Sequence, residues 1–262
     1  MEPVILFRPD FNDDTATSGE INIAREYLPV VTSRVELKDK LVIGRYSVLP
    51  FYRELDDDLN IQNSRLINSY FEHDYIASFS WYEDVVDMTP RTWFRLQDVP
   101  KDGGPYIVKG RTNSRKFEWD KLMFAPTFKR ACEIEGELMQ DGLIGPQGGV
   151  IREYVPLKTL EVGLHGLPFA NEWRFFFYGT QRLCNGFYWT AAEARGVMDN
   201  AGLDFANRVA ARISKRASFF VIDIAEKSAG GWTLIEVNDA QMSGLSECDP
   251  RDLYMNLARV IA

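Results

Sequence analysis

One stretch of the chain, residues 219–238, restricts most strongly what the chain can fold into. Two apolar runs flank a Ser-Ala-Gly-Gly turn, a pattern typical of two buried strands joined as a hairpin. Asp223 lies near the end of the first run, and Glu236 and Asn238 lie at the end of the second. Side chains alternate along a strand, so Glu236 and Asn238 point to one face, and a suitable register brings Asp223 within reach. Three oxygen donors placed in this way suit a hard divalent cation such as Mg2+. The alternative interpretation is a surface hairpin with solvated acids.

An Asp on one strand followed by Glu-x-Asn on the next resembles the metal site of the ATP-grasp superfamily. Members of that superfamily typically join a carboxylate to an amine or another nucleophile through an acyl phosphate. The resemblance implies that Asp223, Glu236 and Asn238 hold Mg2+, or Mn2+ in its place, against the phosphates of ATP.

The segment over residues 89–110 resembles a second ATP-grasp passage, in which a Thr-Pro turn precedes a helix and a strand whose terminal lysine touches ATP. The predicted strand covers residues 106–110, and its lysine is Lys109. An ammonium at a strand end can meet an α- or β-phosphate as a point charge. Taken without the resemblance, Lys109 is an ordinary solvated lysine.

Residues 111–121 follow this strand and contain no glycine. Many ATP-grasp proteins have a glycine-rich loop here that folds over the phosphates through backbone amides. In this chain Arg111, Arg115 and Lys116 stand in its place, so we expect side-chain charges to do more of the phosphate binding. One ATP-grasp clade is marked by two arginines and one lysine, and this chain is a candidate member. The alternative is a solvated basic loop.

The strand expected over residues 149–155 resembles the hinge between the two nucleotide-binding lobes. In such hinges a backbone carbonyl and an amide contact the adenine edge, and an acid a few residues on meets the ribose. Pro156 cannot donate a hydrogen bond, so the amide has to come from Val155 or its neighbours. An ordinary strand-to-loop junction is the alternative. The residues that the resemblance assigns to the nucleotide here are Glu153, Tyr154, Val155, Lys158 and Glu161.

Glu172 and Arg174 lie two apart in an apolar run that is followed by a turn and a second run, which predicts another hairpin. The pattern resembles the ATP-grasp strand whose arginine contacts the phosphates or the acyl phosphate. An arginine in an apolar strand needs a partner, because a lone buried charge is costly. That partner is either Glu172 or a bound phosphate, and we favour the phosphate.

The order of expected elements predicts an α+β fold whose first lobe is α/β. Apolar spacing predicts helices over residues 21–28, 128–139, 191–217 and 249–261. The resemblance implies an ATP-grasp fold, in which two lobes clasp the nucleotide. The expected segments are an N-terminal lobe over residues 1–75, a first nucleotide-binding lobe over 76–155 and a second lobe with the metal site over 156–262.

Composition excludes several classes of function. The net charge is −8, which argues against general binding to the phosphate backbone of nucleic acids. No long apolar run exists, so no membrane span is expected. Three separated cysteines without a Cys-x-x-Cys motif predict a reducing, cytoplasmic location. Two histidines leave little material for a histidine-based metal site or a Ser-His-Asp triad.

The resemblance implies an ADP-forming carboxylate–amine ligase in which Lys109 and Arg174 act on the phosphates. The expected partners are ATP, a carboxylate and a nucleophile from an amino acid, a peptide or a protein terminus. Three alternatives stay open: a nucleotide-binding protein without turnover, a kinase-like phosphoryl transferase, and a protein-interaction domain whose charges form surface ion pairs.

Overall fold

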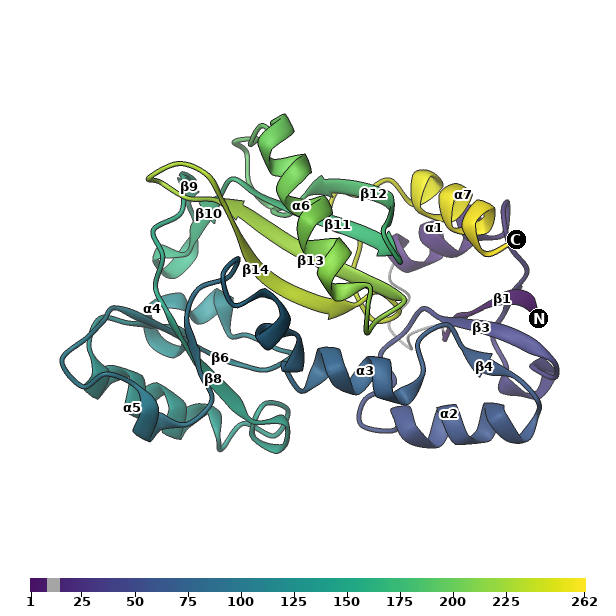
Figure 1. The fold of residues 1–262 in the computed structure, drawn as a ribbon, viewed down its shortest axis with the longest axis horizontal. Coiled ribbons are helices and arrows are strands. Elements are labelled where there is room, and N and C mark those ends of the chain that lie inside the picture. The colour runs from purple at the N-terminus through teal and green to yellow at the C-terminus, as the bar shows by residue number, and fades with distance from the viewer. Residues whose placement is uncertain (9–14) are drawn as a thin grey trace.

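The structure is a computed structural model that describes residues 1–8 and 15–262. These residues form three four-stranded sheets and a short two-stranded one, with helices packed around them (Figure 1). The predicted mixture of helices and sheets is confirmed. The strands are β1 (Glu2–Leu6), β2 (Val30–Val31), β3 (Lys40–Gly44), β4 (Arg65–Leu66), β5 (Thr92–Trp93), β6 (Tyr106–Gly110), β7 (Phe124–Ala125), β8 (Gly149–Glu153), β9 (Thr159–Val162), β10 (Pro168–Ala170), β11 (Glu172–Tyr178), β12 (Gln181–Phe187), β13 (Phe219–Glu226) and β14 (Trp232–Asp239).

The α-helices are α1 (Thr15–Ala24), α2 (Tyr52–Ile61), α3 (Tyr70–Ala77), α4 (Trp119–Leu122), α5 (Phe128–Leu138), α6 (Asn200–Ile213) and α7 (Pro250–Ile261). Short 3-10 helices are η1 (Arg34–Glu36), η2 (Ser80–Val85), η3 (Leu96–Asp98), η4 (Lys116–Glu118), η5 (Gly145–Gln147) and η6 (Leu164–Gly166). Among the described residues, no helix has both the length and the apolar character needed to cross a membrane.

The N-terminal sheet has the parallel order β2-β1-β3-β4. Alternate residues of β1 face opposite ways, which divides its apolar side chains between two cores. Val4 packs in the core against helix α2, whereas Ile5 packs in a second core with Phe176 of the central sheet and Leu253 of α7. The N-terminal lobe therefore shares a hydrophobic core with the sheet that carries the predicted metal site.

The central sheet has the antiparallel order β12-β11-β13-β14 and is covered on both faces. Phe205, Val209 and Ile213 of α6 pack on one face, and α7 packs on the other (Figure 1). The hairpin predicted over residues 219–238 is confirmed as β13–β14. Because both faces are buried, the strands read as nearly continuous apolar runs, and a polar side chain within them stands out.

Two helices differ from the prediction at their N-terminal ends. The helix expected over residues 191–217 begins at Asn200, because the carboxylate of Asp199 accepts a hydrogen bond from the Gly202 amide and caps the helix there. The helix expected over 21–28 runs from Thr15 to Ala24. The chain after it forms a tighter turn in which the Tyr27 amide bonds the Ala24 carbonyl. Apolar spacing alone located both helices but not their limits.

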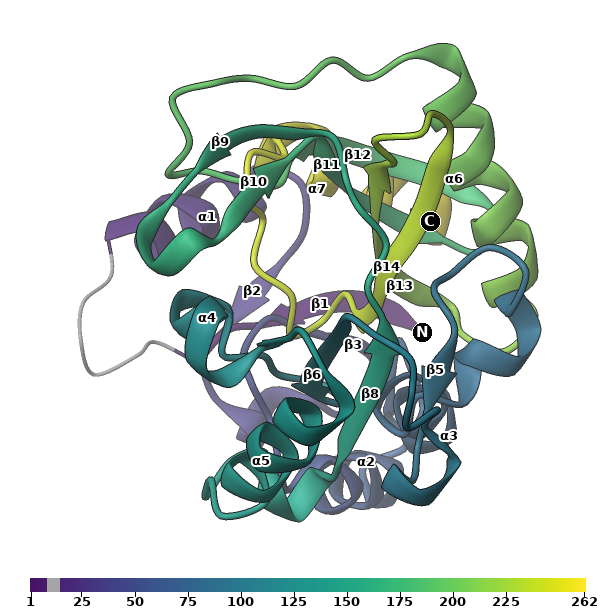
Figure 2. The ribbon, with the colours of Figure 1, turned by 90° about the vertical axis from the view of Figure 1, so that its left-hand side faces the viewer.

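The third four-stranded sheet, here called the β6–β8 sheet, has the antiparallel order β5-β8-β6-β7, and α5 covers one of its faces. In Figure 2 this sheet lies below the hairpin β9–β10 and the central sheet. Contacts join the two sides at the edge: His165 Nδ1 of η6 lies 3.7 Å from Asp120 Oδ1 of α4. Each four-stranded sheet lies within one of the three predicted segments, although the segment boundaries themselves stay predictions.

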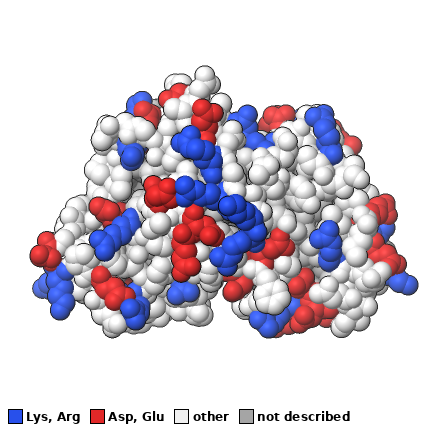
Figure 3. All heavy atoms as spheres, viewed as in Figure 1, with Lys and Arg blue, Asp and Glu red and all other residues white. Residues whose placement is uncertain are grey.

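Charges on the surface are mixed. On the face shown in Figure 3, basic and acidic side chains lie interspersed. Several exposed side chains form ion pairs, such as Arg212 with Asp87 and Arg216 with Asp84. Exposed pairs of this kind contribute little to stability. The larger electrostatic energies therefore belong to charges inside the fold.

Asn68 ties the N-terminal lobe to the central sheet. Its side chain is buried, donates to the Phe219 carbonyl (2.6 Å) and to Asp239 Oδ1 (3.0 Å), and accepts from the Phe219 amide (2.8 Å). The amide therefore reproduces the pairing of a further strand at the start of β13.

We predict that Asn68→Ala lowers the free energy of unfolding by about 3 kcal/mol, because it leaves the buried amide and carbonyl of Phe219 without partners. Urea unfolding measures the loss. The matched control is Asn60→Ala, which changes an exposed asparagine of α2 and should alter stability by less than about 0.5 kcal/mol. Equal losses in the two variants would contradict the assignment of Asn68 as the link between lobes.

Candidate functional site

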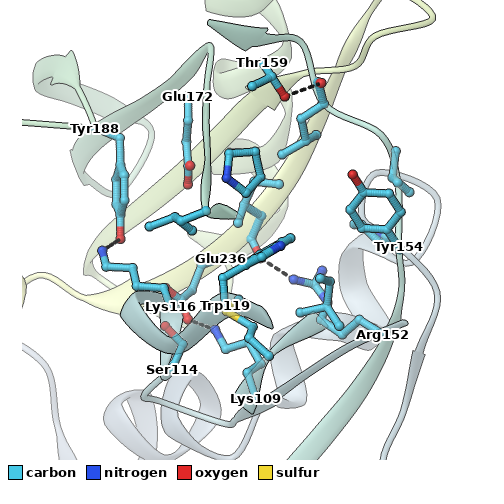
Figure 4. Close-up of a pocket in the computed structure, with 18 of the residues that line it drawn as sticks. Lys109, Ser114, Lys116, Trp119, Arg152, Tyr154, Thr159, Glu172, Tyr188 and Glu236 are labelled. Atoms are coloured by element: carbon cyan, nitrogen blue, oxygen red, sulfur yellow. Dashed lines mark hydrogen bonds and ion pairs between the residues drawn. The ribbon is translucent and has the colours of Figure 1, made fainter. Parts of the chain in front are cut away.

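A cavity of about 120 Å3 lies between the β6–β8 sheet and the central sheet (Figure 4). One part of its wall is apolar or aromatic, and the other part carries charged side chains. The apolar part includes Ile107, Trp119, Met123, Tyr154, Val155, Leu167 and Trp189. The charged side chains are Lys109, Lys116, Arg152, Glu153, Glu172 and Glu236. A concave site with an apolar wall and a few convergent charges is the usual form of a small-ligand site.

Lys109 and Glu236 face each other at the inner end of this cavity. Lys109 lies near the end of β6, Glu236 lies on β14, and the ammonium donates a hydrogen bond to Glu236 Oε1 (Figure 4). Burial raises the pKa of Glu236, but the charge and the hydrogen bond of Lys109 outweigh burial and hold this pKa below its ordinary value. Glu236 is therefore a carboxylate at neutral pH.

Arg174 and Asp223 form a second buried pair. The two residues lie directly opposite each other on β11 and β13, so strand register alone brings them together. Arg174 Nε and one terminal nitrogen donate to the two carboxylate oxygens of Asp223 at 2.9 and 2.8 Å, and the other terminal nitrogen donates to the Gly244 carbonyl at 2.7 Å. Our expectation that Arg174 is paired either with Glu172 or with a phosphate is corrected: in this structure its partner is Asp223.

Burial also affects the carboxyl group of Asp223. Desolvation raises the pKa of Asp223, although the adjacent Arg174 guanidinium acts in the opposite direction. The same pair raises the pKa of Arg174, because the charge and hydrogen bonds of Asp223 exceed the cost of burial. A bidentate Arg–carboxylate pair of this geometry is strong but stays sensitive to the loss of either partner.

The three predicted metal ligands lie on the two paired strands. Asp223 is directly opposite Glu236, with a bulge beside Asp223, and Asn238 follows two residues later on β14. A hydrogen bond from the Asn238 side chain also contributes to the lowered pKa of Glu236. Two carboxylates and an amide oxygen are donors that fit Mg2+. No group of three or more His, Cys, Asp or Glu side chains suited to a metal ion occurs in the described part of the chain, so the amide of Asn238 is needed for the set.

Arg152 is a charged residue of this cavity that the sequence reasoning did not single out. It lies on β8, is buried, and donates to Thr89 Oγ1 (2.6 Å), Thr92 Oγ1 (3.2 Å) and the Ile235 carbonyl (2.5 Å). Burial without a paired carboxylate lowers its pKa to about 10. An arginine inside the apolar run 149–155 was the available signal, the same signal that identified Arg174.

Lys116 and Glu172 lie on the side of the cavity next to Tyr188 (Figure 4). Lys116 Nζ donates to the Tyr188 hydroxyl at 2.8 Å, and burial lowers its pKa. Burial and then the charge of Asp223 raise the pKa of Glu172 to about 8. Glu172 thus projects a carboxyl group into the cavity that is largely protonated at neutral pH.

The hinge segment lies at the apolar end of the cavity. Glu153, Tyr154 and Val155 all line it. The Glu153 amide bonds the Arg91 carbonyl and the Tyr154 amide bonds the Pro105 carbonyl, at 2.8 and 3.1 Å. Among the described residues, the Val155 amide has no backbone partner, so it is the donor of this segment that a ligand can use.

Four residues assigned to the nucleotide lie away from this cavity. Lys158 is half exposed and pairs with Glu226 at 2.9 Å. One oxygen of Glu161 accepts hydrogen bonds from the amides of residues 193 and 194, at 2.9 and 3.2 Å. Arg115 pairs with Asp141 on the surface, and Arg111 lines a second cavity. Contact of these four residues with ATP stays a prediction.

Two sheets around a charged cavity are the architecture of a known family of nucleotide-dependent proteins. Residues 98–257 match the family described as an ATP-grasp domain, family 3 of the clade named for two arginines and one lysine. This match covers more than half of the chain, so the chain belongs to that ATP-grasp family. No curated protein matches the sequence.

Solved structures share the fold at low sequence identity. The RimK domain ATP-grasp protein from Sphaerobacter thermophilus has a TM-score of 0.60 at 14% identity, over 99% of this chain and 98% of that one. PsnB, a ligase complexed with a phosphomimetic variant of its minimal precursor, Mg and ADP, has a TM-score of 0.60 at 12% identity, over 100% and 99%. D-alanine–D-alanine ligase from Bacillus anthracis, complexed with ATP, has a TM-score of 0.57 at 12% identity, over 91% and 84%. The ATP-grasp fold expected from the sequence is confirmed.

The raised pKa of Glu172 yields a stability prediction. An unfolded glutamate titrates near 4.5, whereas the folded group titrates near 8, so the folded state binds more protons between these values and stability falls as pH rises through this window. Glu172→Gln removes this loss. We expect the variant to gain stability over the wild type by a few kcal/mol between pH 5 and pH 9, measured by urea unfolding at each pH.

The control for this experiment is Glu153→Gln, which changes an exposed glutamate on the edge of the same cavity. Its stability difference from the wild type should stay constant over the same pH range. Parallel pH curves for the wild type and Glu172→Gln would refute the raised pKa.

Proposed function

We propose that the protein is an ATP- and Mg2+-dependent ligase that joins a carboxylate to an amine, or a similar nucleophile, and releases ADP. The observation that carries the proposal is the pairing of charges at the inner end of the cavity. Each of the two cations expected to hold phosphate, Lys109 and Arg174, is paired with a carboxylate expected to hold metal, Glu236 and Asp223. The ATP-grasp family membership supports the same assignment.

These two pairs suggest how a nucleotide–metal complex is accommodated. Removing one partner of a buried ion pair costs about 3–5 kcal/mol, since the other charge is left alone. ATP with Mg2+ brings anionic phosphates for the two cations and a divalent cation for the two carboxylates. Lys109 and Arg174 can therefore turn to phosphate while Asp223 and Glu236 turn to metal, and no charge is left unpaired. Asn238 supplies the third, neutral oxygen donor.

The apolar end of the cavity suits the base of the nucleotide. Ile107, Met123 and Leu167 offer aliphatic surface, and the free amide of Val155 offers a donor to the base edge. The base would thus lie about the length of a triphosphate away from the paired charges. We assign the two arginines and one lysine of the clade to Arg152, Arg174 and Lys109, the buried cations around this cavity.

The chemistry of the proposed reaction needs no nucleophile from the protein. A substrate carboxylate oxygen attacks the γ-phosphorus of ATP, the bond to the β-phosphate oxygen breaks, and ADP leaves. The amine then attacks the acyl carbon of the acyl phosphate, inorganic phosphate leaves, and the nitrogen loses a proton. Bound Mg2+ would offset charge on the β- and γ-phosphates. Lys109, Arg152 and Arg174 act by positioning and by electrostatic stabilisation, which supply most of the catalysis in phosphoryl transfer.

Structural neighbours support ligation over the alternatives. D-alanine–D-alanine ligase and PsnB both have the fold and are described as ligases. A kinase-like enzyme on the same fold would stop after phosphoryl transfer, and a nucleotide-binding protein would release no ADP. The distribution of cysteines remains consistent with the cytoplasmic location that we propose.

We predict that ATP with Mg2+ stabilises the wild-type protein in a thermal-unfolding titration. At about 100 times the dissociation constant the gain is about 2.7 kcal/mol. Lys109→Ala and Glu236→Gln should lose most of this gain, because each removes one participant in the exchange of charges. Omitting Mg2+ should reduce the gain in the wild type. An ADP-release assay with candidate carboxylates and amines then measures turnover, and mass analysis separates a ligated product from a phosphorylated one.

Lys158→Ala is the matched control, because Lys158 pairs with Glu226 outside the cavity. It should respond to ATP as the wild type does. Absence of any Mg2+-dependent gain in the wild type would contradict the proposed function. A gain that persists in both Lys109→Ala and Glu236→Gln would place the nucleotide elsewhere.

A further inference from the structure

A second cavity of about 120 Å3 lies beside the first. Its wall is formed by the N-terminal lobe, the segment after β6 and the end of β14. The two cavities share no lining residue, but they border the same two strands. On β14, Glu236 lines the first cavity and Asn238 lines the second; along the other strand and its continuation, Lys109 lines the first and Arg111 the second. The boundary between the cavities therefore coincides with the proposed metal and phosphate site.

Arg111 brings a positive charge without a carboxylate partner to this second cavity. Its Nε is buried and has no hydrogen-bond partner among the described residues, and one terminal nitrogen makes a long contact of 3.4 Å with the Ser78 carbonyl. Gly148 has a φ of 81° and packs where an added Cβ would lie 3.4 Å from Arg111 Nε. Lys109, Arg174 and Arg45 each have a carboxylate, so Arg111 differs from the other buried or half-buried cations around it except Arg152.

Asp239 and His73 bring the opposite charge to the same cavity. Asp239 is buried, with Oδ1 accepting from the Asn68 side chain and the Gln241 amide, both at 3.0 Å, and Oδ2 lying 3.1 Å from His73 Nδ1. No lysine or arginine pairs with Asp239 among the described residues. The carboxylate thus holds its charge against neutral donors and one histidine, and Arg111 is not within ion-pair distance of it.

We infer that this second cavity binds a small zwitterion, a free amino acid or a close analogue, as a substrate of the proposed ligase. The carboxylate of the amino acid would lie on the Arg111 guanidinium, next to the phosphate site, and its ammonium group would face the His73–Asp239 pair. A molecule with both charges complements a cavity with two separated charges of opposite sign. This inference names the substrate class of the proposed function and rests on it for the reaction, but not for the binding.

The size of the cavity supports one amino acid. Its volume equals the space of roughly ten water molecules, enough for a small zwitterion and its side chain. Ile76, Ala77, Leu49 and Met242 supply an apolar part of the wall. We therefore expect small or aliphatic side chains to bind better than large charged ones. A segment of peptide would carry a neutral amide where the cavity has charge to offer, and it would leave Asp239 or Arg111 unpaired.

Isothermal titration of amino acids into the full-length protein tests the inference, with and without the ATP analogue AMPPNP and Mg2+. The probes are the twenty protein L-amino acids together with D-alanine. For the tightest binder, its carboxamide and its N-acetyl derivative are compared, since each lacks one of the two charges. We expect at least one amino acid to bind, and both derivatives to bind at least tenfold more weakly.

Arg111→Gln is compared with Arg115→Gln, an exposed arginine of the same segment that pairs with Asp141. Arg111→Gln should weaken the amino acid at least tenfold, leave its carboxamide unchanged, and leave the AMPPNP–Mg2+ affinity within about twofold. Arg111→Lys should restore part of the loss, because it keeps the charge but not the fork of donors. Arg115→Gln should behave as the wild type. If Arg111→Gln does not fold, the comparison of the amino acid with its two derivatives on the wild type still decides the matter.

Three outcomes would overturn the inference: no amino acid binds, the carboxamide binds as tightly as the acid, or Arg111→Gln weakens the nucleotide instead of the amino acid. The proposed function fails separately. If an amino acid binds as described but AMPPNP–Mg2+ does not, the zwitterion site stands and the ligase does not.

Discussion

The structure depends on how charges are kept inside a largely apolar sheet. Asp223 and Arg174 lie opposite each other on neighbouring strands, and Glu236 meets Lys109 from the facing lobe. A lone charge at any of these positions would be costly, whereas paired charges are tolerated. The pairs also hold the two sheets in a fixed relation, since Lys109 and Glu236 come from different lobes. The site is therefore built from the same contacts that stabilise the fold.

Those contacts make the ligand-free site electrostatically balanced but exchangeable. Two cations and two carboxylates neutralise one another, and a nucleotide–metal complex offers each of them a new partner of the right sign. Glu172 fits the same scheme, because its raised pKa keeps it uncharged beside Asp223. An additional negative charge at that point would oppose phosphate. Burial therefore sets which acids stay ionised for metal and which one stays neutral.

The glycine-free segment after Lys109 illustrates how this chain differs from the ATP-grasp pattern that it resembles. Arg111, Arg115 and Lys116 were expected to share the work of a phosphate loop. The structure separates them: Lys116 reaches the first cavity, Arg111 the second, and Arg115 an acid on the surface. Neighbours in the sequence thus serve different surfaces, because the segment turns through η4 and α4 instead of continuing as a strand.

The sequence by itself determined the hairpin with Asp223, Glu236 and Asn238, the strand that ends near Lys109, and the ATP-grasp class. Alternating and continuous apolar runs mark strands, and polar residues within such runs mark sites, so both are visible without coordinates. Tertiary structure alone decided that Arg174 pairs with Asp223, that Arg152 joins the cavity, and that Glu161 lies away from it. Partner choice depends on strand register and on residues far apart in the chain, neither of which local patterns encode. The limits of α6 likewise followed from one cap at Asp199, and the pKa of Glu172 followed from burial, which only packing creates.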